Sequence, residues 1–248
     1  MNQGVTRKCN PSFFYPAMRN RSLRAFVFDA YGTLFDVHSI TAAAEAIAPR
    51  QGALLSQIWR TKQLQYTWLQ SLMIATAQPR DDFATITAKA LDYAVSQLMV
   101  RLGDGDRQRL LDGYGSLAPF PDAHAALAEL APRPRWILSN GTLGMLEPLV
   151  RASALAPHID GILSADAAGI YKPSPRVYQL AVDRLQLEPA DIAFVSSNGW
   201  DAAGAAAFGF TTFWINRNGE PVERHAPEPD FIVGSLANLL PIAQMGAP

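Results

Sequence analysis

The chain has few of the residues that form cross-links and metal centres. Of its 248 residues one is a cysteine, Cys9, and four are histidines, scattered along the sequence at positions 38, 124, 158 and 225. A single cysteine cannot form an internal disulfide, and no Cys/His group has the spacing of a zinc site. This composition fits a reducing compartment, so we expect a cytoplasmic protein without a bound metal or other cofactor.

Long apolar runs and an excess of charge of one sign are missing as well. No stretch approaches the ~20 apolar residues of a membrane span, and no signal peptide is recognisable. Lys and Arg together number 21 and Asp and Glu 22, for a formal net charge of −1. Binding to nucleic acid or to an anionic membrane requires a surplus of basic residues. We therefore expect neither of these partners.

Acidic residues are absent from the first 28 positions, which contain five basic ones. Pro11 and Pro16 interrupt any helix there, and this disfavours the amphipathic helix of a transit peptide. We predict that residues 1–22 form a disordered N-terminal tail, with a targeting segment as the alternative.

Short apolar runs that end in polar residues recur along the rest of the chain. They cover residues 25–28, 136–138, 161–163, 192–195 and 212–215. Runs that are apolar on both faces are typical of the central strands of a parallel sheet. Helical patterns of about 10–15 residues lie between them, as in repeated strand–helix–strand units. The order predicts an α/β fold with a doubly wound parallel sheet and right-handed crossovers.

Residues 37–117 interrupt this order, because they contain no good strand pattern. They carry long helical patterns instead, such as Leu64, Trp68 and Leu72. We predict an all-helical cap over residues 37–117, inserted into a core domain of residues 23–36 and 118–248. The insert begins just after the first strand, so it would cover the carboxyl end of the sheet.

Polar residues at the carboxyl ends of the strands are the candidate site, since ligands bind there in open α/β sheets. They are Asp29, Thr33, Ser139, Asn140, Lys172, Ser196, Asn198 and Asp201. A carboxylate nucleophile, a lysine to hold its charge, hydroxyl and amide donors and a second carboxylate together favour a covalent hydrolase.

Four motifs in a fixed order carry a family resemblance. They are Asp29-Ala30-Tyr31-Gly32-Thr33-Leu34, Ser139-Asn140-Gly141, Lys172-Pro173 and Ser196-Ser197-Asn198-Gly199-Trp200-Asp201, with Trp59-Arg60-x-x-Gln63-Leu64-x-Tyr66-Thr67-Trp68-Leu69 in the cap. From about Leu23 to Leu240 the chain resembles the haloacid dehalogenase superfamily, and most closely its L-2-haloacid dehalogenases. The resemblance implies a Rossmann-like core, a cofactor-independent hydrolysis of short-chain (S)-2-haloacids to (R)-2-hydroxyacids with inversion, and a homodimer through the cap helices.

Two departures separate this chain from the magnesium-dependent phosphatases of the same superfamily. Those enzymes carry a second aspartate two places after the nucleophile as a general acid, and here that place is Tyr31. They also have acidic residues at the fourth strand end, where this chain has Ser196, Ser197 and Asn198, leaving Asp201 as the carboxylate there. Magnesium prefers several oxygen ligands, whereas a halide leaves without a proton or a metal. The departures favour carbon–halogen displacement.

The resemblance also implies a role for each residue. Asp29 would attack carbon 2 of the 2-haloalkanoate and form an ester, Lys172 would hold Asp29 ionised, and Asp201 would orient Lys172 and activate the hydrolytic water. The supporting catalytic residues would be Thr33, Tyr178, Ser196 and Asn198. The substrate carboxylate would meet the backbone amides of Ala30 and Tyr31 together with Ser139. The departing halide would meet Arg60 and Asn140, and the apolar wall would be Tyr31, Leu64, Phe83 and Trp200.

Other interpretations stay open at this point. The serines and asparagines at the strand ends could satisfy turn backbone, and Asp29 and Asp201 could cap helices. At the level of function, the alternatives are a phosphatase or phosphotransferase of the same superfamily and a non-catalytic module that binds a small carboxylate.

Overall fold

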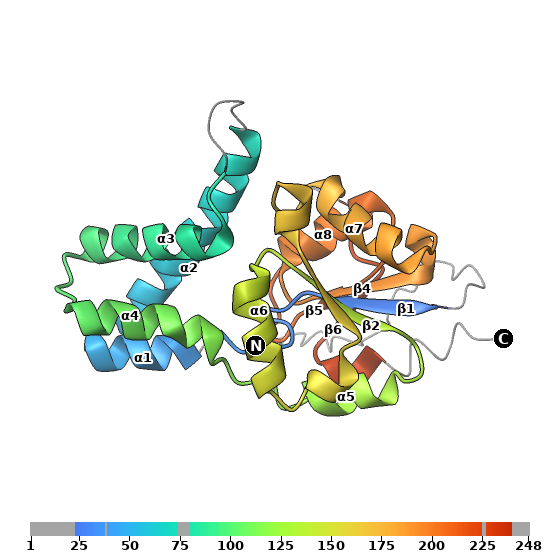
Figure 1. Cartoon of the computed structure of the whole chain (residues 1–248), viewed down its shortest axis with the longest axis horizontal. Coiled ribbons are helices and arrows are strands. Elements are labelled where there is room, and N and C mark those ends of the chain that lie inside the picture. The colour runs from blue at the N-terminus through green and yellow to red at the C-terminus, as the bar shows by residue number, and fades with distance from the viewer. Residues whose placement is uncertain (1–22, 38, 74–79, 225–226, 240–248) are drawn as a thin grey trace, which may run out of the picture.

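The computed structural model describes residues 23–37, 39–73, 80–224 and 227–239, and the predicted tail (residues 1–22) lies outside them. The described chain forms two lobes, a sheet flanked by helices and a lobe built from helices (Figure 1). Within the described ranges, no helix is both long enough and apolar enough to cross a membrane.

Six parallel strands make up the sheet. Their bounds are β1 Ala25–Phe28, β2 Arg135–Ser139, β3 Gly161–Ser164, β4 Ile192–Ser196, β5 Thr211–Ile215 and β6 Phe231–Val233, in the order β3-β2-β1-β4-β5-β6. Strand β1 lies between β2 and β4 and is buried along its whole length. A strand buried on both faces requires apolar residues throughout, which explains the run Ala25-Phe26-Val27-Phe28.

Helices cover both faces of this sheet. In Figure 1, α7 (Pro175–Leu185) and α8 (Gly199–Phe208) lie on one side and α5 (Ala123–Glu129) on the other. Helix α6 (Leu143–Ala152) and the short helices η2 (Ala156–His158), η3 (Ala165–Ala168), η4 (Pro189–Asp191) and η5 (Leu236–Asn238) complete the lobe. This arrangement confirms the predicted doubly wound α/β fold.

Every element that the structure describes between residues 39 and 115 is a helix. The bounds are α1 Ser39–Ile47, α2 Gly52–Leu72, α3 Phe83–Leu98, α4 Asp104–Asp112 and the short helix η1 Gly113–Gly115. Gly52 lies at the crossing of α1 and α2, where an added Cβ would be 2.1 Å from the backbone nitrogen of Glu45. Trp59 of α2 donates its indole N–H to the Thr87 carbonyl of α3 at 2.8 Å. Asp82 caps α3 by accepting the Thr85 amide at 2.7 Å.

The two chain segments that join the lobes run side by side. The Asp36 amide donates to the Ala118 carbonyl at 2.8 Å, and the Phe120 amide donates to the Leu34 carbonyl at 2.9 Å. Both crossings lie just beyond the carboxyl end of β1, so the helical lobe stands at that end of the sheet (Figure 1).

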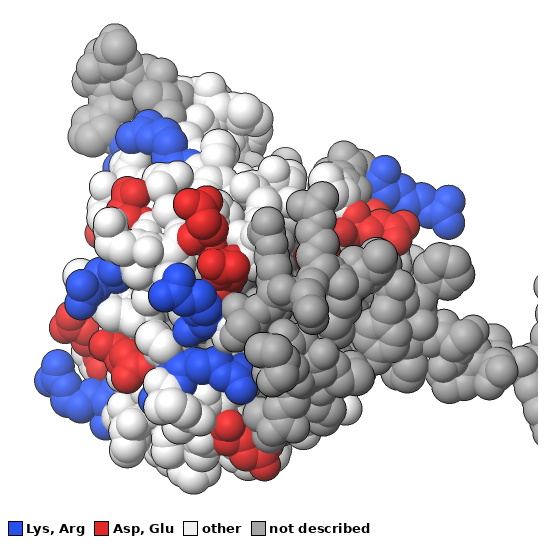
Figure 2. Space-filling model, turned by 90° about the vertical axis from the view of Figure 1, so that its right-hand side faces the viewer, with Lys and Arg blue, Asp and Glu red and all other residues white. Residues whose placement is uncertain are grey.

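The surface carries no dominant charge on the face shown in Figure 2, where basic and acidic side chains are interspersed. This agrees with the balanced composition of 21 basic and 22 acidic residues.

Candidate active site

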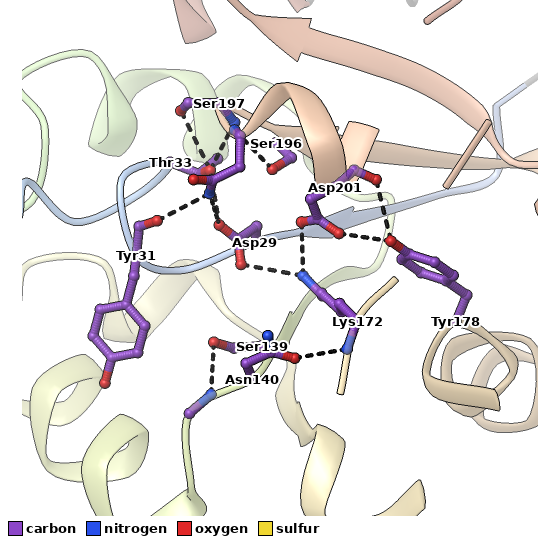
Figure 3. Close-up of polar contacts among 12 residues, drawn as sticks. Asp29, Tyr31, Thr33, Ser139, Asn140, Lys172, Tyr178, Ser196, Ser197 and Asp201 are labelled. Atoms are coloured by element: carbon purple, nitrogen blue, oxygen red, sulfur yellow. Dashed lines mark hydrogen bonds and ion pairs between the residues drawn. The ribbon is translucent and has the colours of Figure 1, made fainter. Parts of the chain in front are cut away.

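The site is formed by the ends of neighbouring strands and the loops that follow them. Asp29 follows β1, Ser139 is the last residue of β2 and is followed by Asn140, and Ser196 is the last residue of β4. Because β2, β1 and β4 are neighbours in the sheet, their carboxyl ends lie together. Gly32 turns the chain after Asp29 with a φ of +89°, a value that L-residues with side chains rarely adopt. Figure 3 shows the side chains of Asp29, Lys172 and Asp201 pointing toward one another.

Three side chains contact the Asp29 carboxylate. The Lys172 ammonium lies 3.1 Å from Oδ1, while Oδ2 accepts the amide of Asn198 at 2.9 Å and the hydroxyl of Thr33 at 3.2 Å. Asp29 itself is 6% exposed. These donors fix the orientation of the carboxylate, as a nucleophile requires.

Lys172 lies between two carboxylates. Its Nζ is 2.9 Å from Asp201 Oδ2 as well as 3.1 Å from Asp29 Oδ1, and the residue is 1% exposed. Burial disfavours the ammonium, but the charges of Asp201 and Asp29 outweigh burial and raise the pKa of Lys172 above its usual value. Lys172 therefore stays charged and bridges the two carboxylates.

Behind the lysine, Asp201 is fully buried and is held by Tyr178. The Tyr178 hydroxyl donates to Asp201 Oδ1 at 2.8 Å. Burial raises the pKa of Asp201 above its usual value, and the charge of Asp29 adds to the rise. The charge of Lys172 and the hydrogen bond from Tyr178 lower the pKa but do not cancel the rise. A raised pKa makes the ionised carboxylate a stronger base, which suits it to accept a proton.

The donor set is a poor match for the magnesium of the related phosphatases. The position between the Asp29 and Asp201 carboxylates is filled by the Lys172 ammonium, and a divalent cation there would meet a like charge. The described residues contain no group of three or more His, Cys, Asp or Glu side chains arranged to hold a metal ion. The side chains around Asp29 therefore do not fit a magnesium ion.

Several predicted polar residues brace turns. Ser139 Oγ accepts the Gly141 amide at 3.2 Å, and Ser196 Oγ accepts the Asn198 amide at 3.1 Å. Asn140 Oδ1 accepts the Lys172 amide at 2.9 Å. The hydroxyl oxygens of the two serines thus accept turn amides, and Asn140 positions the backbone of Lys172.

Arg60 approaches the site from α2. Its Nη1 donates to Gln63 Oε1 at 2.6 Å, and the Tyr114 hydroxyl lies 3.4 Å from the same oxygen. Burial raises the pKa of Tyr31, Tyr114 adds to the rise, and the Arg60 charge opposes it. In the structure, Gln63 links Arg60 to Tyr114, whose ring meets that of Tyr31 edge-on.

Aromatic rings line the space above the nucleophile loop. Tyr31 stacks on Phe83 with ring centroids 6.0 Å apart and meets Tyr114 edge-on at 5.7 Å. Trp200 packs edge-on against Trp68 of the helical lobe at 5.4 Å. Leu64 is half-buried, as are Arg60 and Trp200, and Ala30 is buried beside Asp29.

An apolar cavity of about 630 Å³ lies between the lobes on the side of Trp200. Trp68 and Leu72 of α2 line it from one side, and Ile170 and Pro173 from the other. Tyr171 lines the same cavity, so the segment on both sides of Lys172 borders it.

Some contacts were not predicted from the sequence. Ser197 donates its amide to Thr33 Oγ1 at 2.9 Å and its hydroxyl to the Gly32 carbonyl at 2.6 Å, so it supports the nucleophile loop. Two of the histidines that are scattered in the sequence meet in the fold: His124 and His158 lie with their Nε2 atoms 3.2 Å apart. Their pairing joins segments that only the fold brings together.

Comparisons with known proteins agree with this geometry. A family model described as haloacid dehalogenase-like hydrolase matches residues 23–209. The chain is 38% identical to an (S)-2-haloacid dehalogenase of Xanthobacter autotrophicus over 240 residues (88% of this chain, 93% of the relative). It is 43% identical to (S)-2-haloacid dehalogenase 4A of Burkholderia cepacia over 223 residues (89% and 95%).

Solved structures are similar as well. A crystal structure of an L-2-haloacid dehalogenase superposes with a TM-score of 0.87 at 42% identity, covering 90% of this chain and 99% of the other. The Xanthobacter autotrophicus L-2-haloacid dehalogenase with chloropropionic acid covalently bound superposes with a TM-score of 0.83 at 37% identity (90% and 98%). The chain belongs to the haloacid dehalogenase-like hydrolases and, within them, to the L-2-haloacid dehalogenase family.

Proposed function

We propose that the protein hydrolyses short-chain (S)-2-haloacids to (R)-2-hydroxyacids with inversion, through an ester on Asp29. The observation that carries this proposal is the Asp29 carboxylate, held by Lys172 on one oxygen and by Asn198 and Thr33 on the other. A positioned, buried carboxylate is a nucleophile for carbon as well as for phosphorus. Two observations favour carbon: the Lys172 ammonium fills the space between the two carboxylates, and the relatives include (S)-2-haloacid dehalogenases.

Two displacements complete the reaction. First, an oxygen of Asp29 forms a bond to carbon 2 opposite the halogen, and the carbon–halogen electron pair leaves as halide. Next, water attacks the carbonyl carbon of the Asp29 ester, and one of its protons passes to Asp201. The bond between the acyl carbon and the oxygen on carbon 2 breaks, and the departing alkoxide takes that proton from Asp201. The second proton of water leaves to solvent, so Asp29 is again a carboxylate. The product keeps the oxygen that Asp29 supplied, and Asp29 receives the oxygen of water.

Donors for the two anions come from both lobes. The amides of Ala30 and Tyr31, in the turn after β1, are suited to the substrate carboxylate together with Ser139. Arg60 from α2 and Asn140 are suited to the departing halide. Asn140 Oδ1 accepts the Lys172 amide, so the NH₂ group of Asn140 is the end that would donate to the halide.

Chloride release from racemic 2-chloropropionate in magnesium-free buffer with a chelator tests the proposal. Release should stop at half of the substrate, with the D-enantiomer left over. In a single turnover with excess enzyme in ¹⁸O-water, the label should enter the protein and not the product. Complete absence of chloride release, with magnesium-stimulated phosphate release from esters instead, would overturn the assignment.

Asp29→Asn should abolish turnover in freshly purified protein, before deamidation can regenerate aspartate. Asp183→Asn is the matched control, because Asp183 lies in α7 and its carboxylate accepts a hydrogen bond from Gln179 at the surface. Full activity in the Asp29 variant would exclude the ester mechanism.

The homodimer and the cytoplasmic location stay predictions. Leu54, Leu69 and Leu72 on α2 are exposed and form the surface that a homodimer through the cap helices would cover.

A further inference from the structure

The helical lobe contacts the core segment that precedes Lys172 through an ion pair, a cation–π contact and two hydrogen bonds. Arg80 Nη2 lies 2.5 Å from Asp166 Oδ1 at the start of η3, and its guanidinium carbon lies 4.1 Å from the centre of the Tyr171 ring. The Tyr171 amide donates to Ser71 Oγ of α2 at 3.2 Å, and its hydroxyl donates to the Asp81 carbonyl at 2.7 Å. We call these five residues the latch.

On the side of the helical lobe the latch is fixed by its neighbours. The Asp81 amide donates to Gln70 Oε1 at 2.9 Å, and Gln70 Nε2 donates back to Asp81 Oδ2 at 2.7 Å. Lys89 of α3 lies 2.6 Å from the same carboxylate oxygen. Arg80 Nη1 donates to the Asp81 carbonyl at 3.1 Å. That carbonyl oxygen therefore accepts hydrogen bonds from both Arg80 and the Tyr171 hydroxyl. The residues that meet the core are thereby anchored to α2 and α3.

On the side of the core the latch is adjacent to the catalytic lysine. Tyr171 is fully buried and packs on Phe83 of α3 with ring centroids 6.3 Å apart. The next residue, Lys172, donates its amide to Asn140 and its ammonium to Asp29. The backbone at residues 171–172 is therefore pinned from the helical lobe and from β2 at once. One peptide bond separates the pinned tyrosine from the lysine that aligns the nucleophile.

We propose that Arg80 and Tyr171 are positioning residues, which lock the helical lobe onto the Lys172 segment and thereby align the Lys172 ammonium with the Asp29 carboxylate. This inference rests on the proposed function. Neither residue touches the reacting atoms, so each acts through Lys172. The physical reason is that a displacement of about 1 Å at a reacting group can lower a rate by up to ~100-fold.

Substitutions separate positioning from general stability. Arg80→Ala removes both the ion pair and the stacking on Tyr171, and should lower kcat about tenfold while KM changes less than about threefold. Arg80→Lys keeps a cation for Asp166 but not the planar stacking group, so it should restore part of kcat. Arg107→Ala is the matched control, because Arg107 pairs with Asp92 entirely within the helical lobe, at 2.8 and 2.9 Å. It should leave kcat unchanged.

A readout that needs no substrate accompanies the kinetics. Trp68 and Trp200 meet across the two lobes and both indole nitrogens are buried. Loosening the latch should expose them, so acrylamide should quench tryptophan fluorescence more strongly in Arg80→Ala than in the wild type or Arg107→Ala. Circular dichroism checks that each variant is folded.

The outcomes are distinguishable. If the wild type turns over no 2-haloacid, the proposed function fails, and the quenching difference alone then decides on the latch. If the wild type is active and Arg80→Ala keeps both its kcat and its quenching, the positioning role is refuted. An equal loss of kcat in Arg80→Ala and Arg107→Ala would refute it too, because the effect would then reflect stability of the helical lobe.

Discussion

The hydrogen bond from Tyr178 to Asp201 leads to a quantitative prediction for Tyr178→Phe. The hydroxyl donates to Asp201 Oδ1 at 2.8 Å in a fully buried setting. A hydrogen bond to a charged group contributes about 1.5–3 kcal/mol, and one pKa unit corresponds to about 1.4 kcal/mol. Because the bond stabilises the ionised carboxylate, its loss should raise the pKa of Asp201 by about 1–2 units. The acid limb of kcat/KM for chloride release should move to higher pH by the same amount.

The acid limb should move to higher pH because Asp201 acts in its ionised form. Asp201 must be ionised to accept the proton of water, so a higher pKa removes activity over a wider acidic range, while the plateau at higher pH changes less. Tyr93→Phe serves as control, since the Tyr93 ring is 39% exposed on α3, away from the site. A Tyr178→Phe profile whose acid limb stays in place, or moves to lower pH, would refute the reasoning.

Two further predictions concern the helical lobe. Gln63→Leu should lower kcat/KM for 2-chloropropionate about tenfold, because Arg60 loses the acceptor that orients it, whereas Gln65→Leu on the exposed face should not. Gly52→Ala should lower the unfolding free energy by about 1–3 kcal/mol in urea titrations, because its Cβ would overlap the backbone of α1. Gly105→Ala in α4 meets nothing within 4 Å and should be neutral or slightly stabilising, so equal losses in the two glycine variants would contradict the packing argument.

The strands and the polar positions at their ends could be predicted from the sequence because each depends on local pattern. Apolar runs such as residues 192–195 fix a central strand, and parallel strands place their carboxyl ends along one edge. Strand β6 (Phe231–Val233) was not predicted. It is three residues long and pairs on one side with β5, so its sequence needs no long apolar run.

The contacts that orient the site depend on residues far apart in the chain. Gln63 lies three residues after Arg60 on α2, a spacing that places both on one helix face, so its hydrogen bond to Arg60 has a sequence signal. Its contact with Tyr114 has none, because 51 residues separate them. The same is true of Tyr171 and Asp81, which are 90 residues apart.

Hydroxyl groups show a different limit. Ser139 and Ser196 stand at strand ends, where a serine can either bind a ligand or accept a backbone amide. A ligand-binding serine and a turn-bracing serine have the same sequence pattern there. The structure shows the amide contacts in both. A sequence pattern that identifies where a side chain stands does not identify which partner its oxygen takes.

Charge balance explains why the site needs both lobes. The core alone buries two carboxylates, Asp29 and Asp201, against one ammonium, Lys172. A haloacid substrate would add a third carboxylate, which an already negative, poorly solvated site would repel. Arg60, carried by α2, is the cation that the helical lobe brings toward Tyr31 and offsets this charge. Because this arginine comes from the helical lobe, the site that receives the substrate anion needs both lobes.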